Sequence, residues 1–267
     1  MNNLIKATNP NGVEIRFDEE PHTYETDNCK DFMSATTIIE EFFPPFDEYN
    51  ISKRYAKKHG RTQQDVLDEW KAINEESILQ GGNVHLYCEN ILTNKEVPEP
   101  RNEKEIKIRK NADKAMELLC DKYELVESEK IIFSEKYKLA GTVDLIMRNK
   151  INGEILLFDW KTNKKIELTS YWKEYGFNPV SHLENVNFSQ YSLQLNLYKW
   201  MLLEEKYYDN ISEMKIVHLI DSKSVWYDIE DMQREISDMV HYEHNKSEVD
   251  NVKDLMRSIR LKTKRDY

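Results

Sequence analysis

The spacing of apolar and polar positions divides the chain into three zones with different expected structures. Residues 13–33 contain VEIRF and a second extended stretch around Thr23–Tyr24, and this pattern predicts a small hairpin. Residues 34–123 repeat apolar positions at helical spacing. From residue 124 onward the pattern changes to short segments rich in Ile, Leu, Val and Phe between turn residues, which is typical of strands.

The second zone predicts a series of helices with recognisable ends. Ser34 is a suitable N-cap for SATTIIEEFF, which the prolines at 44–45 end. Thr62 is a suitable N-cap for TQQDVLDEWKAINEESIL, and after the glycines at 81–82 a further helix, NVHLYCENIL, follows. A charged helix, KEIKIRKNADKAMELLCDKY, closes the zone.

The third zone predicts three adjacent antiparallel strands, then a helix and two more strands. The first three strands are VESEKIIFS, KLAGTVDLIM and EILLFDWKT, and the helix is SQYSLQLNLYKWMLLEEKY. The strands MKIVHLI and SVWYDI and a helical C-terminal stretch follow. We therefore predict an α/β fold, with a central mixed β-sheet flanked by helices and an N-terminal helical elaboration in front of it.

Composition narrows the class of protein. The chain has 267 residues, enough for one large domain or two small ones, and 33% of them are charged. With 15 Tyr and 5 Trp it is too aromatic for a disordered chain, and no apolar run approaches the length of a bilayer span. Because the start MNNLIKATNPNG also lacks the apolar stretch of a secretory signal, we expect a soluble, cytoplasmic protein with no membrane partner.

Cysteine usage and net charge remove further classes. Cys29, Cys88 and Cys120 are widely spaced and form no CxxC pair, so they favour a reducing compartment and do not suggest zinc. Three cysteines are too few for a four-cysteine iron–sulfur cluster from this chain alone. The net charge of −11 argues against a general nucleic-acid coat protein, although phosphate contacts need only a local basic surface.

Candidate chemistry gathers between Gly141 and Lys161. On a strand, side chains alternate between faces, so Asp159 and Lys161 point the same way, about 7 Å apart at their Cα atoms. Trp160 then points to the other face. If the two strands pair, Asp144 on the preceding strand can come opposite Asp159. Two carboxylates and one ammonium would converge at one end of an otherwise apolar sheet.

This set is what phosphodiester cleavage at neutral pH requires. A divalent cation polarises a phosphoryl oxygen and lowers the pKa of an attacking water, and Mg²⁺ typically takes one or two carboxylates from a protein. Asp144 and Asp159 supply these carboxylates, and the backbone carbonyl of Trp160 can add another oxygen. Lys161 can stabilise the charge at phosphorus or position the water. The alternative is that Asp144 merely ends a strand and that Asp159 and Lys161 form a surface ion pair, which the neighbouring Phe158 and Trp160 do not favour.

The order Gly-x-x-Asp, apolar strand, Asp-x-Lys-Thr also carries a family resemblance. GTVDLIM followed by LLFDWKT is similar to the PD-(D/E)XK nuclease superfamily, and particularly to its RecB-like exonuclease branch. Within that branch the sequence resembles phage exonucleases and the mitochondrial genome-maintenance exonuclease. The chain resembles the cluster-free type, because cluster-binding members carry four ligands and no cysteine here lies beyond Cys120.

Three further elements match that branch and imply roles for individual residues. GGNVHLYCEN resembles its Gly-x-x-His element, which implies that His85 is a metal ligand. Glu129, fifteen residues before Asp144, matches a Glu on the strand leading into the core and implies catalytic or metal-linked support. SLQLNLY matches a downstream Gln-x-x-x-Tyr element, which implies that Gln194 and Tyr198 hold the DNA strand near the metal.

The resemblance implies a restriction-endonuclease-like core and a metal-dependent deoxyribonuclease. By analogy it implies an exonuclease that uses Mg²⁺ or Mn²⁺ on DNA ends, with single-stranded DNA favoured. It further implies a phage-encoded protein in the host cytoplasm, with partner proteins of recombination, repair or replication. Residues 1–123 would form one wall of the DNA cleft and residues 124–267 the nuclease core, with His85 contributed from the helical region. A structure- or sequence-specific endonuclease and a catalytically inactive nucleic-acid-binding module remain open alternatives.

Some of these residues have simpler explanations. The stripe that contains Gln194 and Tyr198 is also what packing of a helix on a sheet would give, and VESEK offers Glu127 as well as Glu129. His85 is distinguished from the other histidines by the family match alone. For the remaining six a packing or surface role is expected: His22, His59, His182, His218, His241 and His244.

Two basic clusters are candidates for phosphate contacts. SKRYAKKHGR is expected to dock DNA through Lys53, Lys57 and Arg61, with Arg54, Lys58 and His59 on the same stretch. Tyr49 and Tyr55 nearby could stack single-stranded bases, but core packing is the expected role. The C-terminal run RSIRLKTKR is the weaker cluster, and its cations are Arg257, Arg260, Lys262, Lys264 and Arg265.

Overall fold

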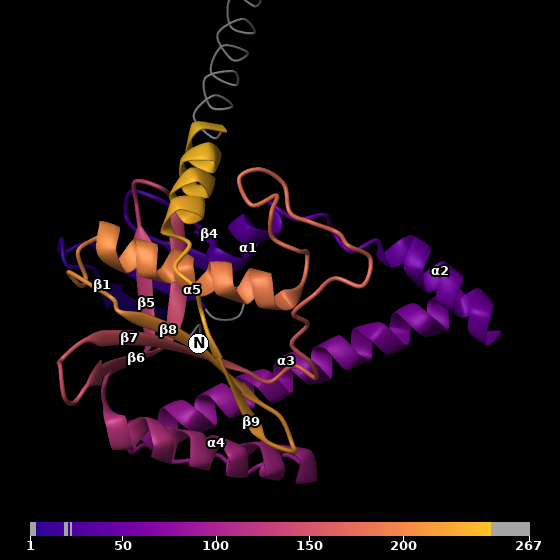
Figure 1. Ribbon diagram of the computed structural model, residues 1–267, viewed down its shortest axis with the longest axis horizontal. Coiled ribbons are helices and arrows are strands. Elements are labelled where there is room, and N and C mark those ends of the chain that lie inside the picture. Colours follow the sequence, from indigo (N-terminus) through magenta and orange to yellow (C-terminus); the bar gives the residue numbers. More distant parts are fainter. Residues whose placement is uncertain (1–3, 19–20, 22, 247–267) are drawn as a thin grey trace, which may run out of the picture.

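A six-stranded β-sheet lies at the centre of the computed structural model, which describes residues 4–18, 21 and 23–246 (Figure 1). Its strands are β4 (Met33–Ser34), β5 (Tyr123–Ser134), β6 (Leu139–Asn149), β7 (Ile155–Lys161), β8 (Glu213–Leu219) and β9 (Ser224–Asp228). β6 pairs antiparallel with β5 and β7, whereas β7 and β8 run parallel. The predicted run of antiparallel strands and the mixed character of the sheet are therefore confirmed.

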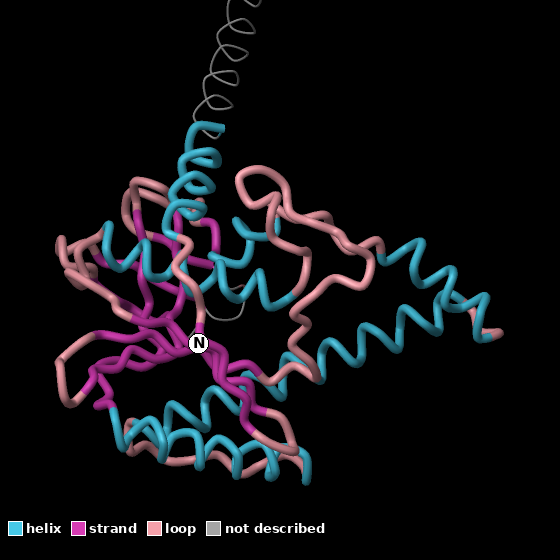
Figure 2. The backbone as a smooth tube through the Cα atoms, in the orientation of Figure 1, coloured by secondary structure: helices cyan, strands magenta, loops and turns pink. Residues whose placement is uncertain are grey.

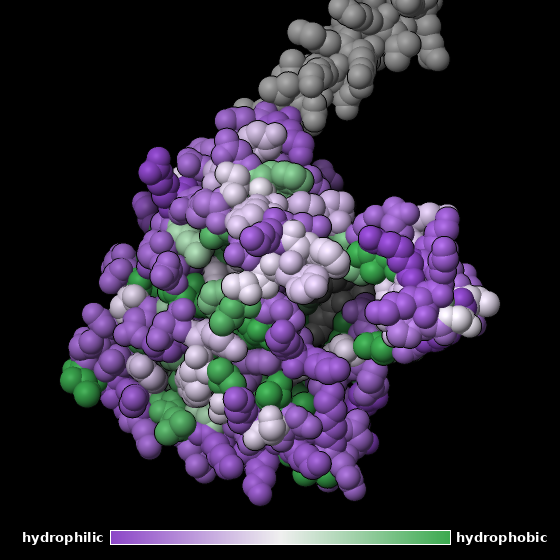
Figure 3. Space-filling model, turned by 45° about the vertical axis from the view of Figure 1, so that its right-hand side comes forward, coloured by the Kyte–Doolittle hydropathy of each residue, from purple (hydrophilic) through white to green (hydrophobic). Residues whose placement is uncertain are grey.

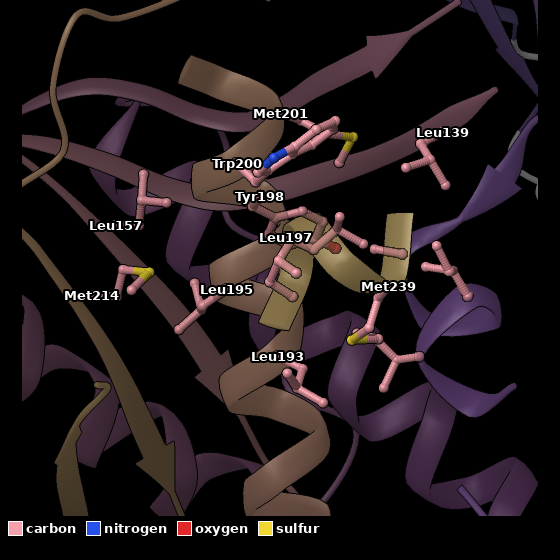
Figure 4. Packing of buried hydrophobic residues seen from close by; sticks show 14 of the residues in the cluster. Leu139, Leu157, Leu193, Leu195, Leu197, Tyr198, Trp200, Met201, Met214 and Met239 are labelled. Carbon is pink, nitrogen blue, oxygen red and sulfur yellow. The ribbon is translucent and has the colours of Figure 1, made fainter. Parts of the chain in front are cut away.

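Helices cover both faces of this sheet (Figures 1 and 2). α3 (Gln63–Leu92) and α4 (Glu103–Lys122) lie against one face, and α1 (Ala35–Glu40) and α5 (Asn187–Glu204) lie against the other. Side chains of β7 alternate between the two layers: Leu157 packs with α5, and Phe158 and Trp160 pack with α3 and α4. Figure 4 shows the layer between the sheet and α5, where leucines of α5 lie beside Leu157 and Met214. The predicted α/β class is confirmed.

A second, three-stranded antiparallel sheet lies at the start of the chain. It consists of β1 (Leu4–Thr8), β2 (Glu14–Asp18) and β3 (Thr23–Glu25), in that order. Ile15, Phe17 and Tyr24 pack on Ile131 and Phe133 of β5. The predicted hairpin is β2 with β3. β1 was not predicted, because LIKAT is an exposed edge strand without the alternation that marks a half-buried one.

The predicted helix starts are correct in position and in chemistry. Ser34 caps α1 by accepting the N–H of Thr37 at 3.1 Å, and Thr62 caps α3 by accepting the N–H of Asp65 at 3.1 Å. α1 ends at Glu40, earlier than the apolar pattern suggests. The reason is that Phe42 and Phe43 are buried in the core from the turn that follows the helix.

The expected interruption of the helical zone at Gly81–Gly82 is wrong, because α3 runs without a break from Gln63 to Leu92. Glycine keeps its N–H donor, so it lowers helix stability by about 1 kcal/mol without preventing the helix. Gly81 also has a packing reason, since a Cβ atom there would lie 3.2 Å from Oγ1 of Thr162. At 1.5 Å per residue, the 30 residues of α3 extend for about 45 Å.

The N-terminal part of α3 leaves the sheet and projects outward together with α2 (Glu48–His59), as Figure 1 shows. We call α2 and residues 63–79 of α3 the arm. The side chains of residues 71–79 are all exposed, whereas Gln80, Val84 and Cys88 further along α3 are buried. Figure 3 shows a hollow between the arm and the body of the molecule.

Candidate active site

The site lies where one edge of β6 changes its pairing partner. β7 pairs with residues 145–148 of β6, and β4 pairs with residues 139–140 on the same edge. Asp144 is the next residue beyond the β7 pairing, and continuation of that register places it opposite Asp159. The backbone N–H of Trp160 donates a 2.8 Å hydrogen bond to Oδ2 of Asp144. A side-chain carboxylate thus replaces a backbone acceptor at the point where the strands separate.

Three side chains of types that commonly bind metals converge on this point. A ring nitrogen of His85 and carboxylate oxygens of Glu129 and Asp144 all lie within 4.8 Å of one another. Nδ1 of His85 is 3.4 Å from Oδ2 of Asp144 and 4.0 Å from Oε1 of Glu129. They come from α3, β5 and β6, so the fold, and not local sequence, brings them together. Two carboxylates and one imidazole form a donor set that fits a divalent cation.

Glu129 is held in a costly arrangement. Its φ is +48°, in the left-handed region that residues other than glycine rarely adopt, and the pairs on either side of it in β5 and β6 place it opposite Asp144. Burial, followed by repulsion from the Asp144 carboxylate, raises the pKa of Glu129 to about 9. Backbone strain and a carboxyl group that resists ionisation are both features that concentrate at functional sites.

The buried Asp159 forms an ion pair with the half-buried Lys161 beside His85, Glu129 and Asp144. Asp159 is 2% exposed, and Nζ of Lys161 lies 2.6 Å from its Oδ2. Burial raises the pKa of Asp159 to about 6, even though Lys161 favours the ionised form. Burial works against the charge on Lys161, but the carboxylates of Asp159 and Asp144 outweigh it, and the pKa of Lys161 is raised. Lys161 therefore stays protonated at neutral pH, which suits charge stabilisation and does not suit a general base.

Gln194 and Tyr198 extend this network into α5. Oε1 of Gln194 accepts a 3.1 Å hydrogen bond from Nζ of Lys161, and its Nε2 donates a 2.9 Å hydrogen bond to the hydroxyl of Tyr198. Tyr198 is buried against Gly141, where a Cβ atom would lie 2.6 Å from Cε1 of the tyrosine ring. The glycine of the AGTVD segment thus leaves room for the tyrosine that positions Gln194.

Comparison with known proteins agrees with this geometry. Residues 51–265 match the PD-(D/E)XK nuclease superfamily. The chain belongs to this superfamily. It is therefore a nuclease, a hydrolase of DNA in a superfamily whose members use divalent metals. The match confirms the resemblance at the level of the superfamily.

Two further comparisons add little to the superfamily assignment. The crystal structure of SSO0001 is similar with 15% sequence identity and a TM-score of 0.36, and the alignment covers 81% of this chain and 76% of that chain. No curated protein matches the chain. None of the helices within residues 4–18, 21 and 23–246 is long and apolar enough to cross a membrane.

The nuclease site does not gather every residue that the sequence suggested. The three converging side chains include Asp144, but Asp159 is paired with Lys161 instead. The side chain of Trp160 is buried on the face toward α3 and α4. Roles of Asp159 and of the Trp160 carbonyl as metal ligands therefore stay predictions, as does a direct contact of the buried Tyr198 with DNA.

The basic residues of the arm also stay predictions. Lys53, Lys57 and Arg61 are exposed and lie on or next to α2, away from the three ligands, and Arg61 pairs with Glu69 of α3. Among the other histidines, His218 is buried and bonded to the Asn163 carbonyl, in keeping with a packing role. Two predictions lie outside the described residues, namely the packing or surface role of His22 and the C-terminal cluster of Arg257, Arg260, Lys262, Lys264 and Arg265.

Two residues of the nuclease site were missed. Tyr191 lies with its ring 4.5 Å from Nζ of Lys161, close enough for a cation–π contact. Its position three residues before Gln194 puts the two on one helix face, and that spacing could have identified it. Glu89 lies one turn after His85 on α3, and its charge helps to raise the pKa of Glu129. The same i, i+4 rule applied to His85 would have found it.

Proposed function

We propose that this nuclease is an exonuclease that uses Mg²⁺ or Mn²⁺ to hydrolyse phosphodiester bonds from DNA ends, with single-stranded DNA as its preferred substrate. The observation that supports the catalytic assignment is the meeting of His85, Glu129 and Asp144 within 4.8 Å, directly beside the ion pair of Asp159 and Lys161. A group of metal-binding donors next to a cationic side chain is the arrangement that phosphodiester chemistry uses.

The donor set fits a divalent metal on its own chemistry. Glu129 and Asp144 repel each other, and the pKa of Glu129 is raised as a result of burial and of that repulsion, so a cation between them would relieve an existing cost. His85, Glu129 and Asp144 would hold the ion. When bound, such an ion lowers the pKa of a water and polarises the phosphoryl oxygen. The imidazole in this set makes Mn²⁺ a better match than Mg²⁺, which prefers oxygen ligands throughout.

The chain's own residues have separable tasks in this proposal. The N–H of Trp160 fixes one oxygen of Asp144 and so orients its carboxylate. Lys161 carries its proton and positive charge toward the reacting phosphate, where negative charge builds up. Gln194 and Tyr191 hold the ammonium of Lys161 from the side of α5, so that its position does not depend on Asp159 alone. The hydroxyl of Tyr198 accepts a hydrogen bond from Gln194 and so holds its side chain in place.

The preference for ends and for single strands rests on the shape around the site and on the resemblance to the RecB-like branch. The arm stands opposite the body across a hollow, and we infer that residues 1–123 provide one wall of a DNA-binding cleft there (Figure 3). The α2 helix supplies Lys53 and Lys57 to that wall, with Arg61 just beyond its end. The resemblance supports a phage-encoded enzyme of the host cytoplasm that acts with recombination, repair or replication proteins.

Digestion of end-labelled DNA tests this proposal. Single-stranded linear, double-stranded linear and circular DNA are incubated with Mg²⁺ or with Mn²⁺, and Asp159→Asn serves as the inactive control. An exonuclease shortens the linear substrates from their ends and leaves the circles intact. Cleavage of the circles would show an endonuclease instead. Binding without cleavage in both metals would show a catalytically inactive nucleic-acid-binding module.

A further inference from the structure

The loop between β7 and α5 presents large aromatic side chains to solvent. We call residues 162–186 the aromatic loop. Tyr171 is 88% exposed and Trp172 is 75% exposed, and Tyr175 and Phe177 are exposed as well. Aromatic residues normally contribute by burying their large surfaces, so at this exposure packing within the chain does not account for them.

The base of the aromatic loop is fixed. The N–H of Phe177 donates a 2.7 Å hydrogen bond to the carbonyl of Phe42, and the amide of Asn185 donates one of 3.2 Å to the carbonyl of Pro44. Val180 is fully buried in the α5 layer of the core. The exposed rings therefore belong to a loop whose base is fixed beside the linker from α1 to α2. A ligand that binds them would lose less free energy to ordering of the loop.

The aromatic loop is continuous with the nuclease site at both of its ends. It starts directly after Lys161, the last residue of β7, and it leads into α5, which carries Tyr191 and Gln194. Figure 1 shows the loop arching between the body and the start of the arm. The aromatic loop therefore connects the strand that carries Lys161 to the helix that carries Tyr191 and Gln194.

Charge on the arm indicates which of its helices faces a polyanion. α2 carries four cationic side chains, Lys53, Arg54, Lys57 and Lys58, and only one acidic one, Glu48. Residues 63–79 of α3 carry five acidic side chains and only one cationic one, Lys71. The arm is thus positive along α2 and negative along α3. α2 is also the helix that follows the linker beside the aromatic loop.

We propose that Tyr171 and Trp172 stack on unpaired bases of a DNA strand whose backbone runs along α2 and whose end reaches Lys161. This inference rests on the proposed function and names the feature that selects single strands. The two rings meet edge to face, with centroids 4.8 Å apart at 90°, and their exposure leaves ring faces open to a base. Bases within a duplex are already stacked on both sides, so only unpaired bases can use the rings.

Equilibrium binding tests this stacking. A fluorescently labelled single strand and a blunt duplex of equal length are titrated with protein in Ca²⁺, which replaces the catalytic metal to suppress turnover. The double variant Tyr171→Ala with Trp172→Ala should bind the single strand about tenfold more weakly or worse, because each stacked base contributes substantially, and should lose much less affinity for the duplex. The double variant Tyr171→Phe with Trp172→Phe should restore most of the affinity, since it keeps two ring faces.

A matched control separates stacking from loss of exposed apolar surface. Ile151 is 96% exposed at the turn between β6 and β7, and Ile151→Ala should leave both affinities at the wild-type value. The intrinsic fluorescence of Trp172 gives a second readout: single-stranded DNA should quench it in the wild type, and Trp172→Phe should remove that part of the quenching. Equal losses of single-strand and duplex affinity in the alanine variant, or no loss at all, would overturn the proposal.

This experiment distinguishes failure of the stacking from failure of the proposed function. A wild-type protein that degrades linear DNA, but whose alanine variant binds single strands normally, refutes the stacking and leaves the nuclease proposal intact. A wild-type protein that cleaves no DNA in Mg²⁺ or Mn²⁺, but binds single strands through Trp172, refutes the exonuclease and supports the stacking.

Discussion

Residues 63–79 of α3 lie in the arm, whereas residues 80–92 of the same helix pack against the central sheet. The arm half has one strongly buried side chain, Val66, and otherwise exposes charged residues and several apolar ones. The sheet half buries Gln80, Val84, Cys88 and Asn90 and carries His85 to within 3.4 Å of Asp144.

The difference shows how one helix can serve two tasks with different tolerances. In the proposed function His85 is a metal ligand, which must be placed to a fraction of an ångström, and it lies on the half of α3 that is packed against the sheet. In the same proposal the arm half needs only to hold α2 and its cations where DNA would approach, for which exposure and charge suffice. Substitutions in the core should therefore change chemistry or folding, and those in the arm should change binding alone.

The largest effect is expected at the ion pair in the core. Asp159→Ala and Lys161→Ala should each reduce the rate of DNA cleavage by about a thousandfold or more, because they remove preorganised charge at the reacting phosphate. Circular dichroism and thermal melting should show that the fold is retained. Lys71→Ala in the arm is the matched control and should cleave at the normal rate. Activity near that of the wild type in either core variant would refute the site assignment.

A smaller effect, still in the packed half of α3, is expected for the metal. His85→Ala should raise the concentration of Mn²⁺ needed for half-maximal cleavage by about tenfold or more and should shrink the rise in Tm that Mn²⁺ produces. Asn74→Ala, on the exposed half of the same helix, should change neither quantity. If the metal titrations of the wild type and His85→Ala superimpose, His85 is not a ligand.

Two glycines extend the comparison to stability. Gly141→Ala places a Cβ atom 2.6 Å from the ring of Tyr198, so it should lower the free energy of unfolding by about 1–3 kcal/mol. Gly82→Ala lies in α3 with nothing within 4 Å of the new atom and should raise that free energy by about 0.5–1 kcal/mol. Urea denaturation measures both. If Gly82→Ala were destabilised as well, the two halves of α3 would not be joined by regular helix.

The smallest effect is expected from the arm. Lys53→Ala combined with Lys57→Ala should weaken binding to DNA severalfold and uniformly across sequences. The slope of log affinity against log salt should become shallower by about one for each phosphate that these lysines neutralise in the wild type. Fluorescence anisotropy at several salt concentrations gives both numbers. Lys71→Ala, among the acidic side chains of α3, should leave the slope unchanged, and an equal change there would remove the distinction between the two helices of the arm.

Local signals in the sequence were sufficient for most of the fold. Capping residues located the starts of α1 and α3, and alternation located the core strands, because both signals depend on neighbours along the chain. β1 and the continuity of α3 were not predictable in this way. Whether a glycine pair breaks a helix depends on what packs beside it, and Thr162, which lies beside Gly81, is 81 positions further along the chain.

The residues of the candidate site also divide into those that local sequence signals predict and those that depend on tertiary packing. Asp144, Asp159 and Lys161 follow from the alternation and pairing of neighbouring strands, which the sequence indicates directly. His85 and Glu129 required the family resemblance, because their approach to Asp144 depends on how α3 and β5 pack on β6. Tyr191 could have been found from its helical spacing to Gln194, whereas the solvent-exposed rings of Tyr171 and Trp172 carry no pattern that distinguishes them from ordinary loop residues.

Because α3 is unbroken, it also fixes the distance between the tip of the arm and the site. From Gln63 at the tip of the arm to His85 the helix rises about 33 Å, which is roughly the length of ten nucleotides of a stacked strand. If DNA first meets the protein at the tip of the arm, the length of α3 sets the number of nucleotides between the point of first contact and the point of cleavage. Lengthening or shortening the arm by whole turns would change that number while leaving the chemistry at Lys161 as it is.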